Sequence, residues 1–161
     1  MIIEKWAMGE KAIRFFTVAA RLLGADANSR ATRMEFWNQV AFYNYVQGIV
    51  GNSARQRPTE AQWSSARAPF TDVLDELKPE VVVVLGRELW NHLPQGERLA
   101  LGRIDGRALE GRSWATPKGH STVLGMTNHP SWPGFSYKKW RPQVDLLFAA
   151  VPVPSNSSAG A

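Results

Sequence analysis

The run Val81–Gly86 constrains the fold of this chain more than any other stretch of its sequence. It reads VVVVLG, lies just after Pro79 and ends in a glycine. Consecutive β-branched residues favour a strand over a helix. Because the run is apolar at every position rather than at alternate positions, it is typical of a strand that is covered on both faces. The sequence therefore predicts a sheet with helices on both sides.

Apolar periodicity predicts the elements around this strand. A helical pattern covers Ile2–Leu23, and Gly9 can divide it into two helices. Another helix begins after Thr59, which can cap it because Gln62 lies three residues further on. The other expected elements are a strand over Val40–Gln47, a helix over Arg87–Leu93, a turn-rich region up to Lys118, a strand over Thr122–Thr127 and a helix over Tyr137–Ala149, with Pro142 near its first turn.

Strands that alternate with helices predict an α/β fold, here a three-layer α/β/α sandwich around a central parallel sheet. The 161 residues, 44% hydrophobic and with 7 Trp, suffice for one packed domain, which we expect over residues 1–150. Residues 151–161, VPVPSNSSAGA, have the Pro, Ser and Gly content of a disordered tail.

Composition excludes several classes of site. The chain has no Cys, so disulfides and thiolate metal sites are excluded, and His92 and His120 have no carboxylate at a useful spacing for a metal. Without a signal peptide or an apolar run of roughly 20 residues, we expect a soluble, cytoplasmic monomer that has no membrane partner. The net charge of +5 permits a polyanionic partner without requiring one.

Ligands of parallel α/β sheets bind beyond the carboxyl ends of the strands. By this rule the loops after Gln47, Leu85 and Thr127 share one face, and they carry Arg55, Arg57 and His129. The two arginines can hold phosphate, although a solvated basic loop is the alternative interpretation.

Asn44 and His129 are the polar residues with the clearest chemical potential. Asn44 lies in an expected strand, where an unpaired buried amide costs on the order of 1–3 kcal/mol. Its amide donors and acceptor suit the edge of a base, whereas the alternative is a bond to its own backbone. His129 opens the stretch NHPSWPGFSY, and the alternative for it is a loop His that bonds a carbonyl. Small residues and the apolar side chains of Trp132 and Phe135 beside it favour a nucleic-acid contact.

These stretches, in this order and spacing, resemble the uracil-DNA glycosylase superfamily. They are FYNYVQ, RPT at the start of a helix, LKPEVVVVLGRELWNHL and NHPS, within a similarity that runs from about Phe36 to Phe148. Members commonly show a base-contacting Asn on a strand, an Arg-Pro-Thr turn, an apolar run that ends in Leu-Gly and a closing His-Pro-Ser motif.

The resemblance implies roles for individual residues. Asn44 would read the edge of a flipped base, and His129 would stabilise negative charge on the pyrimidine carbonyl oxygen as the glycosidic bond breaks. Phe16, or its neighbour Phe15, matches the aromatic ring that stacks on the base.

On the DNA side, the resemblance implies that Ser131 holds a flanking phosphate and that Trp132 or Phe135 is the intercalating side chain. The implied activity is a DNA N-glycosylase for uracil or another altered pyrimidine, which acts by base flipping without a cofactor, in base excision repair or phage defence. The aromatic residues around Asn44 differ from the usual uracil-enzyme strand, so modified cytosine of phage DNA is an alternative target.

One family motif has no clear counterpart. The superfamily's first strand carries a Gly-rich motif whose acidic or amide residue positions the attacking water. Here only 15 residues precede Phe16, in a helical pattern, and no apolar strand leads to Gly9-Glu10. We expect either a natural start upstream of Met1 or loss of the water-activating group. A catalytically inactive relative that binds DNA or a partner protein is therefore an alternative. A nucleotide-handling enzyme on a similar sheet is disfavoured because the chain has no phosphate-binding loop.

Overall fold

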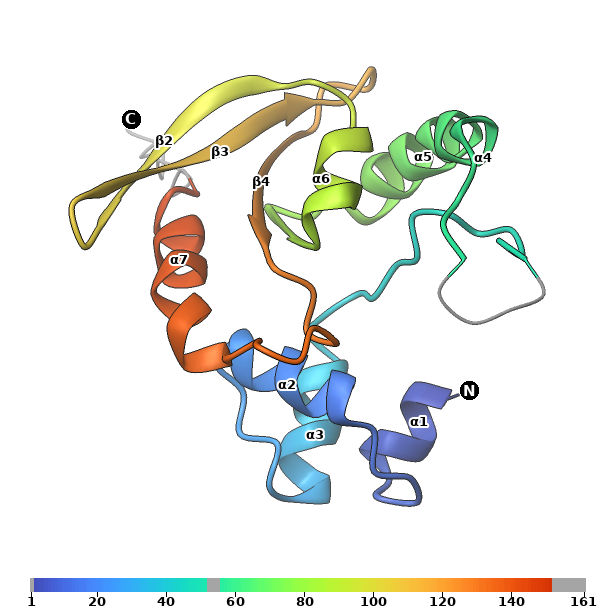
Figure 1. Cartoon of the computed structure of the whole chain (residues 1–161), viewed down its shortest axis with the longest axis vertical. Coiled ribbons are helices and arrows are strands. Elements are labelled where there is room, and N and C mark those ends of the chain that lie inside the picture. Colours follow the sequence, from blue (N-terminus) through green and yellow to red (C-terminus); the bar gives the residue numbers. More distant parts are fainter. Residues whose placement is uncertain (1, 52–55, 152–161) are drawn as a thin grey trace, which may run out of the picture.

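A mixed sheet forms the centre of the structure, a computed structural model that describes residues 2–51 and 56–151 (Figure 1). Its strands in these residues are β1 (Val81–Leu85), β2 (Glu97–Ile104), β3 (Arg107–Ala115) and β4 (Ser121–Thr127), in the spatial order β1-β4-β3-β2. β1 and β4 run parallel, whereas β3 is antiparallel to both β4 and β2. The predicted α/β class is confirmed, and the prediction of a parallel sheet is wrong.

Helices pack on both faces of β1, as its apolar run predicts. Val82 and Val84 belong to a hydrophobic cluster with residues of the two helices that follow Thr59. Val83 and Leu85 belong to another cluster, with residues of the helices over 14–22 and 137–149. The helices of the described residues are α1 (Ile2–Ala7), α2 (Arg14–Leu22), α3 (Arg30–Trp37), α4 (Glu60–Ser65), α5 (Arg67–Leu77), α6 (Arg87–His92) and α7 (Tyr137–Ala149). Thus α4 and α5 cover one face, and α2 and α7 cover the other.

The antiparallel part of the sheet is a hairpin where the sequence indicated only turns. β2 and β3 are joined by Asp105 and Gly106, whose φ angles are 49° and 77°. Two-residue hairpin loops favour Asp-Gly because such loops require positive φ at both positions. The hairpin signal is therefore present in the sequence, but each flanking strand contains a single buried residue and several charged ones, so its strand pattern is weak.

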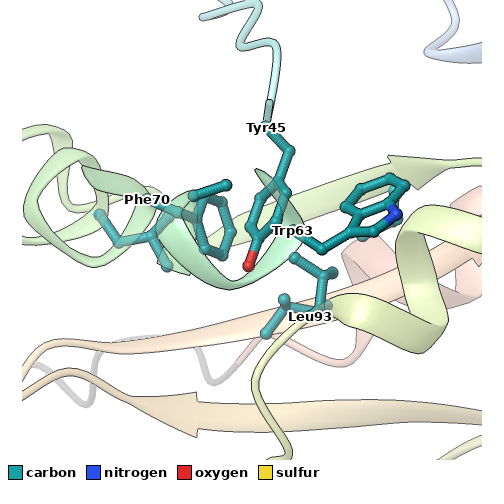
Figure 2. Packing of buried hydrophobic residues seen from close by; sticks show 8 residues of the cluster. Tyr45, Trp63, Phe70 and Leu93 are labelled. Atoms are coloured by element: carbon teal, nitrogen blue, oxygen red, sulfur yellow. The ribbon is translucent and has the colours of Figure 1, made fainter. Parts of the chain in front are cut away.

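Residues 40–47, predicted as a strand, form an irregular segment instead. Side-chain packing holds this segment, since it takes no place in the sheet. The Tyr45 ring is 4% exposed and lies between those of Phe70 and Trp63, at centroid distances of 5.3 and 6.0 Å (Figure 2). Aromatic and β-branched residues favour strands only where a neighbouring strand is available, and here a helical layer takes that place.

The predicted helices are confirmed with small changes, whereas α3 was not predicted. Gly9 separates α1 from α2 and has a φ of 80°. Thr59 caps α4 through a reciprocal capping box, in which its hydroxyl accepts from the Gln62 N–H and the Gln62 side chain accepts from the Thr59 N–H. The expected single helix after Thr59 is divided at Ala66 into α4 and α5. Pro142 lies in the second turn of α7 rather than the first.

The first three helices form an aromatic cluster beside the sheet layers. Trp6, Phe16 and Phe36 are buried in this cluster, with Trp37 packed against them. None of the helices within residues 2–51 and 56–151 has the length and apolar character that a membrane crossing requires. The predicted tail, apart from Val151, and Arg55 lie outside the described residues.

Candidate functional site

An open cleft of about 560 Å³ lies at the carboxyl ends of β1 and β4. Its walls come from residues 44–46, Pro58 and Trp63, the start of α6, and the loop after β4. Asn44, His129 and Trp132 all line it. The structure therefore brings together three of the predicted site residues, which are up to 88 positions apart in the sequence.

The parallel pairing of β1 and β4 places the loop that carries His129. The Gly86 N–H donates to the Thr127 carbonyl at 2.8 Å, so the two strands end side by side. Gly86 has a φ of 121°, and a Cβ at this position would lie 3.6 Å from Cβ of His129. On the other side Nη1 of Arg14 donates to the Pro130 carbonyl at 3.2 Å, which ties the loop to α2.

The His129 ring is held in one orientation and one tautomer. The backbone N–H of Ser131 donates to Nδ1 of His129 at 3.2 Å. A ring nitrogen that accepts a hydrogen bond carries no proton, so the proton of the neutral ring is on Nε2. Partial burial lowers the pKa of His129 below its usual value because it disfavours the charged form. The residue is therefore a neutral imidazole with an Nε2–H donor at physiological pH.

Asn44 differs from its predicted environment. It is exposed and lies in an irregular segment, and its side-chain amide has no hydrogen-bond partner in the described part of the chain. The predicted buried strand position is therefore wrong, and the cost of an unpaired buried amide does not arise. Its neighbour Tyr45 anchors the segment in the core, so the Asn44 backbone is fixed at the edge of the cleft while its amide faces solvent.

The two candidate intercalating side chains lie in different environments. Trp132 is 54% exposed and lines the cleft. Phe135 is buried against α2 and α7, and its ring is stacked on that of Trp140 at 6.5 Å. Only Trp132 of this pair is available to a ligand, because Phe135 fixes the end of the loop in the core.

A similar difference separates Phe15 from Phe16. Phe16 is buried in the α1–α3 cluster, whereas the Phe15 ring lies 5.5 Å from that of His129. Successive helix residues point about 100° apart, so only one of the two can face the loop after β4. Phe15 rather than Phe16 therefore lies beside His129, although neither lines the cleft itself.

The remaining predicted contacts lie at the rim. Arg57 is exposed and pairs with Glu88 at 3.1 Å, which connects the turn before α4 to α6. Ser131 is exposed, and its backbone rather than its hydroxyl contacts His129. Arg55 is outside the described residues, so its predicted role stays a prediction.

The structure adds cleft residues that sequence reasoning did not select. Asn128 precedes His129 and lines the cleft, and Glu88 supplies the carboxylate among the described lining residues. Both follow directly from the rule that loops after parallel strands share a face, since each comes from the loop or helix after β1 or β4. The residue types of Asn128 and Glu88 alone did not mark these positions in the sequence as site residues.

In the described residues, no three His, Asp or Glu side chains are grouped so that they could hold a metal ion. The groups that line the cleft include the Asn44 amide, the His129 imidazole and the Trp132 indole. No protein-family model, curated protein or solved structure matches this chain.

Proposed function

We propose that this chain is a DNA N-glycosylase of the uracil-DNA glycosylase type, acting on uracil or a modified pyrimidine such as a modified cytosine. One observation carries the proposal: Asn44, from the FYNYVQ stretch, lines a single cleft together with His129 and Trp132, from the NHPSWPGFSY stretch. A volume of about 560 Å³ is in the range of small-molecule sites.

The chemistry of each group fits a flipped base. The free amide of Asn44 offers donors and an acceptor to the edge of a base, as base-flipping enzymes require. When the bond between the base nitrogen and C1′ breaks, the electron pair stays on the base and negative charge develops on its carbonyl oxygen. The Nε2–H of His129 is a neutral donor for that oxygen, and one placed donor contributes on the order of 10²–10³ in rate.

Trp132 supplies the exposed apolar surface that such a reaction needs. Extruding a nucleotide costs a few kcal/mol, and an inserted side chain offsets this cost. The indole of Trp132 lines the cleft and is exposed, whereas Phe135 is the aromatic residue of the same loop that packs in the core.

A second candidate is a catalytically silent relative that binds DNA. It is favoured by the pairing of Glu88, the carboxylate among the described lining residues, with Arg57. A carboxylate held in an ion pair is a poor base for activating water. A protein of this kind would bind DNA without cleaving the glycosidic bond.

Excision assays separate the two candidates. The full chain is incubated with duplexes that carry uracil or modified cytosines, and alkali then converts abasic sites into strand breaks. We expect breaks at the altered base and a rate at least 100-fold lower for His129→Ala, with DNA affinity nearly unchanged. Binding without breaks on any duplex would assign the chain to the silent class, and an unchanged rate in His129→Ala would remove this residue from the mechanism.

A further inference from the structure

A second cleft, the α2–α7 cleft, lies between the end of α2 and the start of α7. These two helices contact one another below the sheet (Figure 1). The cleft has a volume of about 690 Å³, and its lining includes Arg21, Lys138 and Arg141. It does not share a residue with the cleft around His129.

Both guanidinium groups of the α2–α7 cleft are held by neighbours. Nη2 of Arg21 donates to Oδ1 of Asn28 at 2.9 Å, and its guanidinium carbon lies 5.9 Å from the Tyr137 ring centroid. Nε of Arg141 donates to Asp145 at 2.6 Å. These contacts use one nitrogen of each guanidinium and leave other N–H groups for a ligand. Arginine that is oriented in advance binds phosphate with less loss of side-chain entropy.

Gly24 makes room for one of these groups. Its φ is 91°, and a Cβ at this position would lie 2.1 Å from Nη1 of Arg141. The guanidinium therefore lies directly over the backbone that follows α2. A side chain at position 24 would require this guanidinium to move.

The charge of the lining is positive. Asp26 is the acidic lining residue, and its Oδ1 accepts from the Asn28 N–H. Lys138 forms no ion pair with a described residue. It lies in the first turn of α7, which contains no acidic residue, and cations at this end of a helix oppose the helix dipole. The lining has three cations and one carboxylate, and Asp145 pairs with Arg141, so the cations exceed the carboxylates by one when this pair is counted.

We propose that the α2–α7 cleft binds a backbone phosphate of nucleic acid, outside the nucleotide that enters the His129 cleft. Bidentate guanidinium groups and an unpaired ammonium are the groups that bind phosphate oxygens. The helix α2 extends from the loop that carries His129, where Arg14 donates to the Pro130 carbonyl, to Arg21 of the α2–α7 cleft, seven residues further on. That separation is about 10 Å along the helix, or about three nucleotides of B-form strand. The choice of nucleic acid over a free phosphate rests on the proposed function.

Adjacent lysines provide a matched test. Lys138 and Lys139 are both exposed on the same turn, but only Lys138 lines the cleft. Lys138→Glu and Lys139→Glu change the net charge equally, so their difference reports the cleft alone. Affinity for a fluorescent 20-nucleotide duplex, with and without uracil, is measured for the full chain from 50 to 200 mM salt. Excision is measured in parallel, and thermal melting of each variant checks the fold.

We expect Lys138→Glu to weaken binding about tenfold and to reduce the salt slope by about one, while Lys139→Glu weakens it about twofold. Arg141→Gln, which removes the positive charge but keeps a polar side chain, should also weaken binding and reduce the salt slope by about one. Equal effects of the two lysine variants, or no DNA binding by the wild type, would overturn the proposal. So would full competition by 1 mM inorganic phosphate, which would identify a small anion as the ligand.

The two proposals can fail separately in this experiment. If the lysine variants differ while no duplex is cleaved, the phosphate site stands and the proposed excision activity fails. If altered bases are excised while the two lysine variants bind DNA equally well, the excision activity stands and the phosphate site fails.

Discussion

The backbone N–H of Ser131 donates a hydrogen bond to Nδ1 of His129, two residues earlier in the chain, at 3.2 Å. This bond forms only with the neutral ring, because a protonated imidazole has no acceptor. Together with partial burial it fixes an Nε2–H donor beside the cleft. The tautomer is thus set by a local turn and does not depend on a second titratable group.

This relationship predicts how His129 titrates. Burial lowers the pKa of His129 below the usual 6.5, so the neutral ring persists at lower pH than in the unfolded chain. The resulting contribution to folding stability is present above pH 6.5 and is lost as the pH falls from there through the folded pKa. NMR titration of the imidazole carbons should show a midpoint below 6.5 for this residue. His129→Asn should flatten the pH dependence of unfolding in that window, and an unchanged slope would contradict the assignment.

The two aromatics of the His129 loop should behave oppositely. Trp132→Ala removes an exposed side chain, so the free energy of unfolding should change by less than about 1 kcal/mol while DNA affinity falls. Phe135→Ala leaves a cavity between α2 and α7 and should cost about 3 kcal/mol. Urea denaturation and DNA titration of both variants check this. Equal stability losses would show that Trp132 is also a core residue.

Asn44→Ala should separate recognition from stability. The side chain is exposed and makes no hydrogen bond to a described residue, so unfolding in urea should be unchanged within about 0.5 kcal/mol. If Asn44 reads the base, the variant should lose its preference for duplexes with an altered base over normal duplexes. Retention of that preference would exclude Asn44 from base recognition.

Gly86→Ala should perturb the site through the backbone. A φ of 121° is strained for any residue with a Cβ and costs about 2 kcal/mol, and the new methyl would contact His129. Gly48→Ala is a suitable control, since its added methyl meets no atom within 4 Å and its φ is not in the left-handed region. Thermal unfolding of the two variants should differ clearly. A shift of the His129 resonances should accompany only Gly86→Ala.

Thr59→Ala tests the capping box of α4. Loss of the hydroxyl that accepts from the Gln62 N–H should cost about 1 kcal/mol. Thr59→Ser keeps the acceptor and should restore most of this loss in urea denaturation. If both variants were equally destabilised, the Thr59 methyl rather than its hydroxyl would be the stabilising group.

Local signals in the sequence predicted much of the fold. The β-branched run of β1 and the Thr59 cap are properties of a few neighbouring residues, and both are confirmed. The prediction of a strand over residues 40–47 is wrong because a strand needs a neighbouring strand to pair with, and the residues of the segment itself do not specify that neighbour. The hairpin of β2 and β3 was not predicted, although Asp105-Gly106 is a turn signal, because each flanking strand contains a single buried residue and several charged ones.

The sequence by itself determined which groups are available: an amide at Asn44, an imidazole at His129 and the aromatic side chains beside it. Only the tertiary structure decided which of them meet. In the folded chain Phe15 lies beside His129, whereas Phe16 is buried in the core. Trp132 is exposed and Phe135 is buried. The burial of Tyr45 places its neighbour Asn44 at the cleft. The physical reason is that burial and proximity depend on contacts between segments far apart in the chain, and residue type constrains these contacts without specifying them.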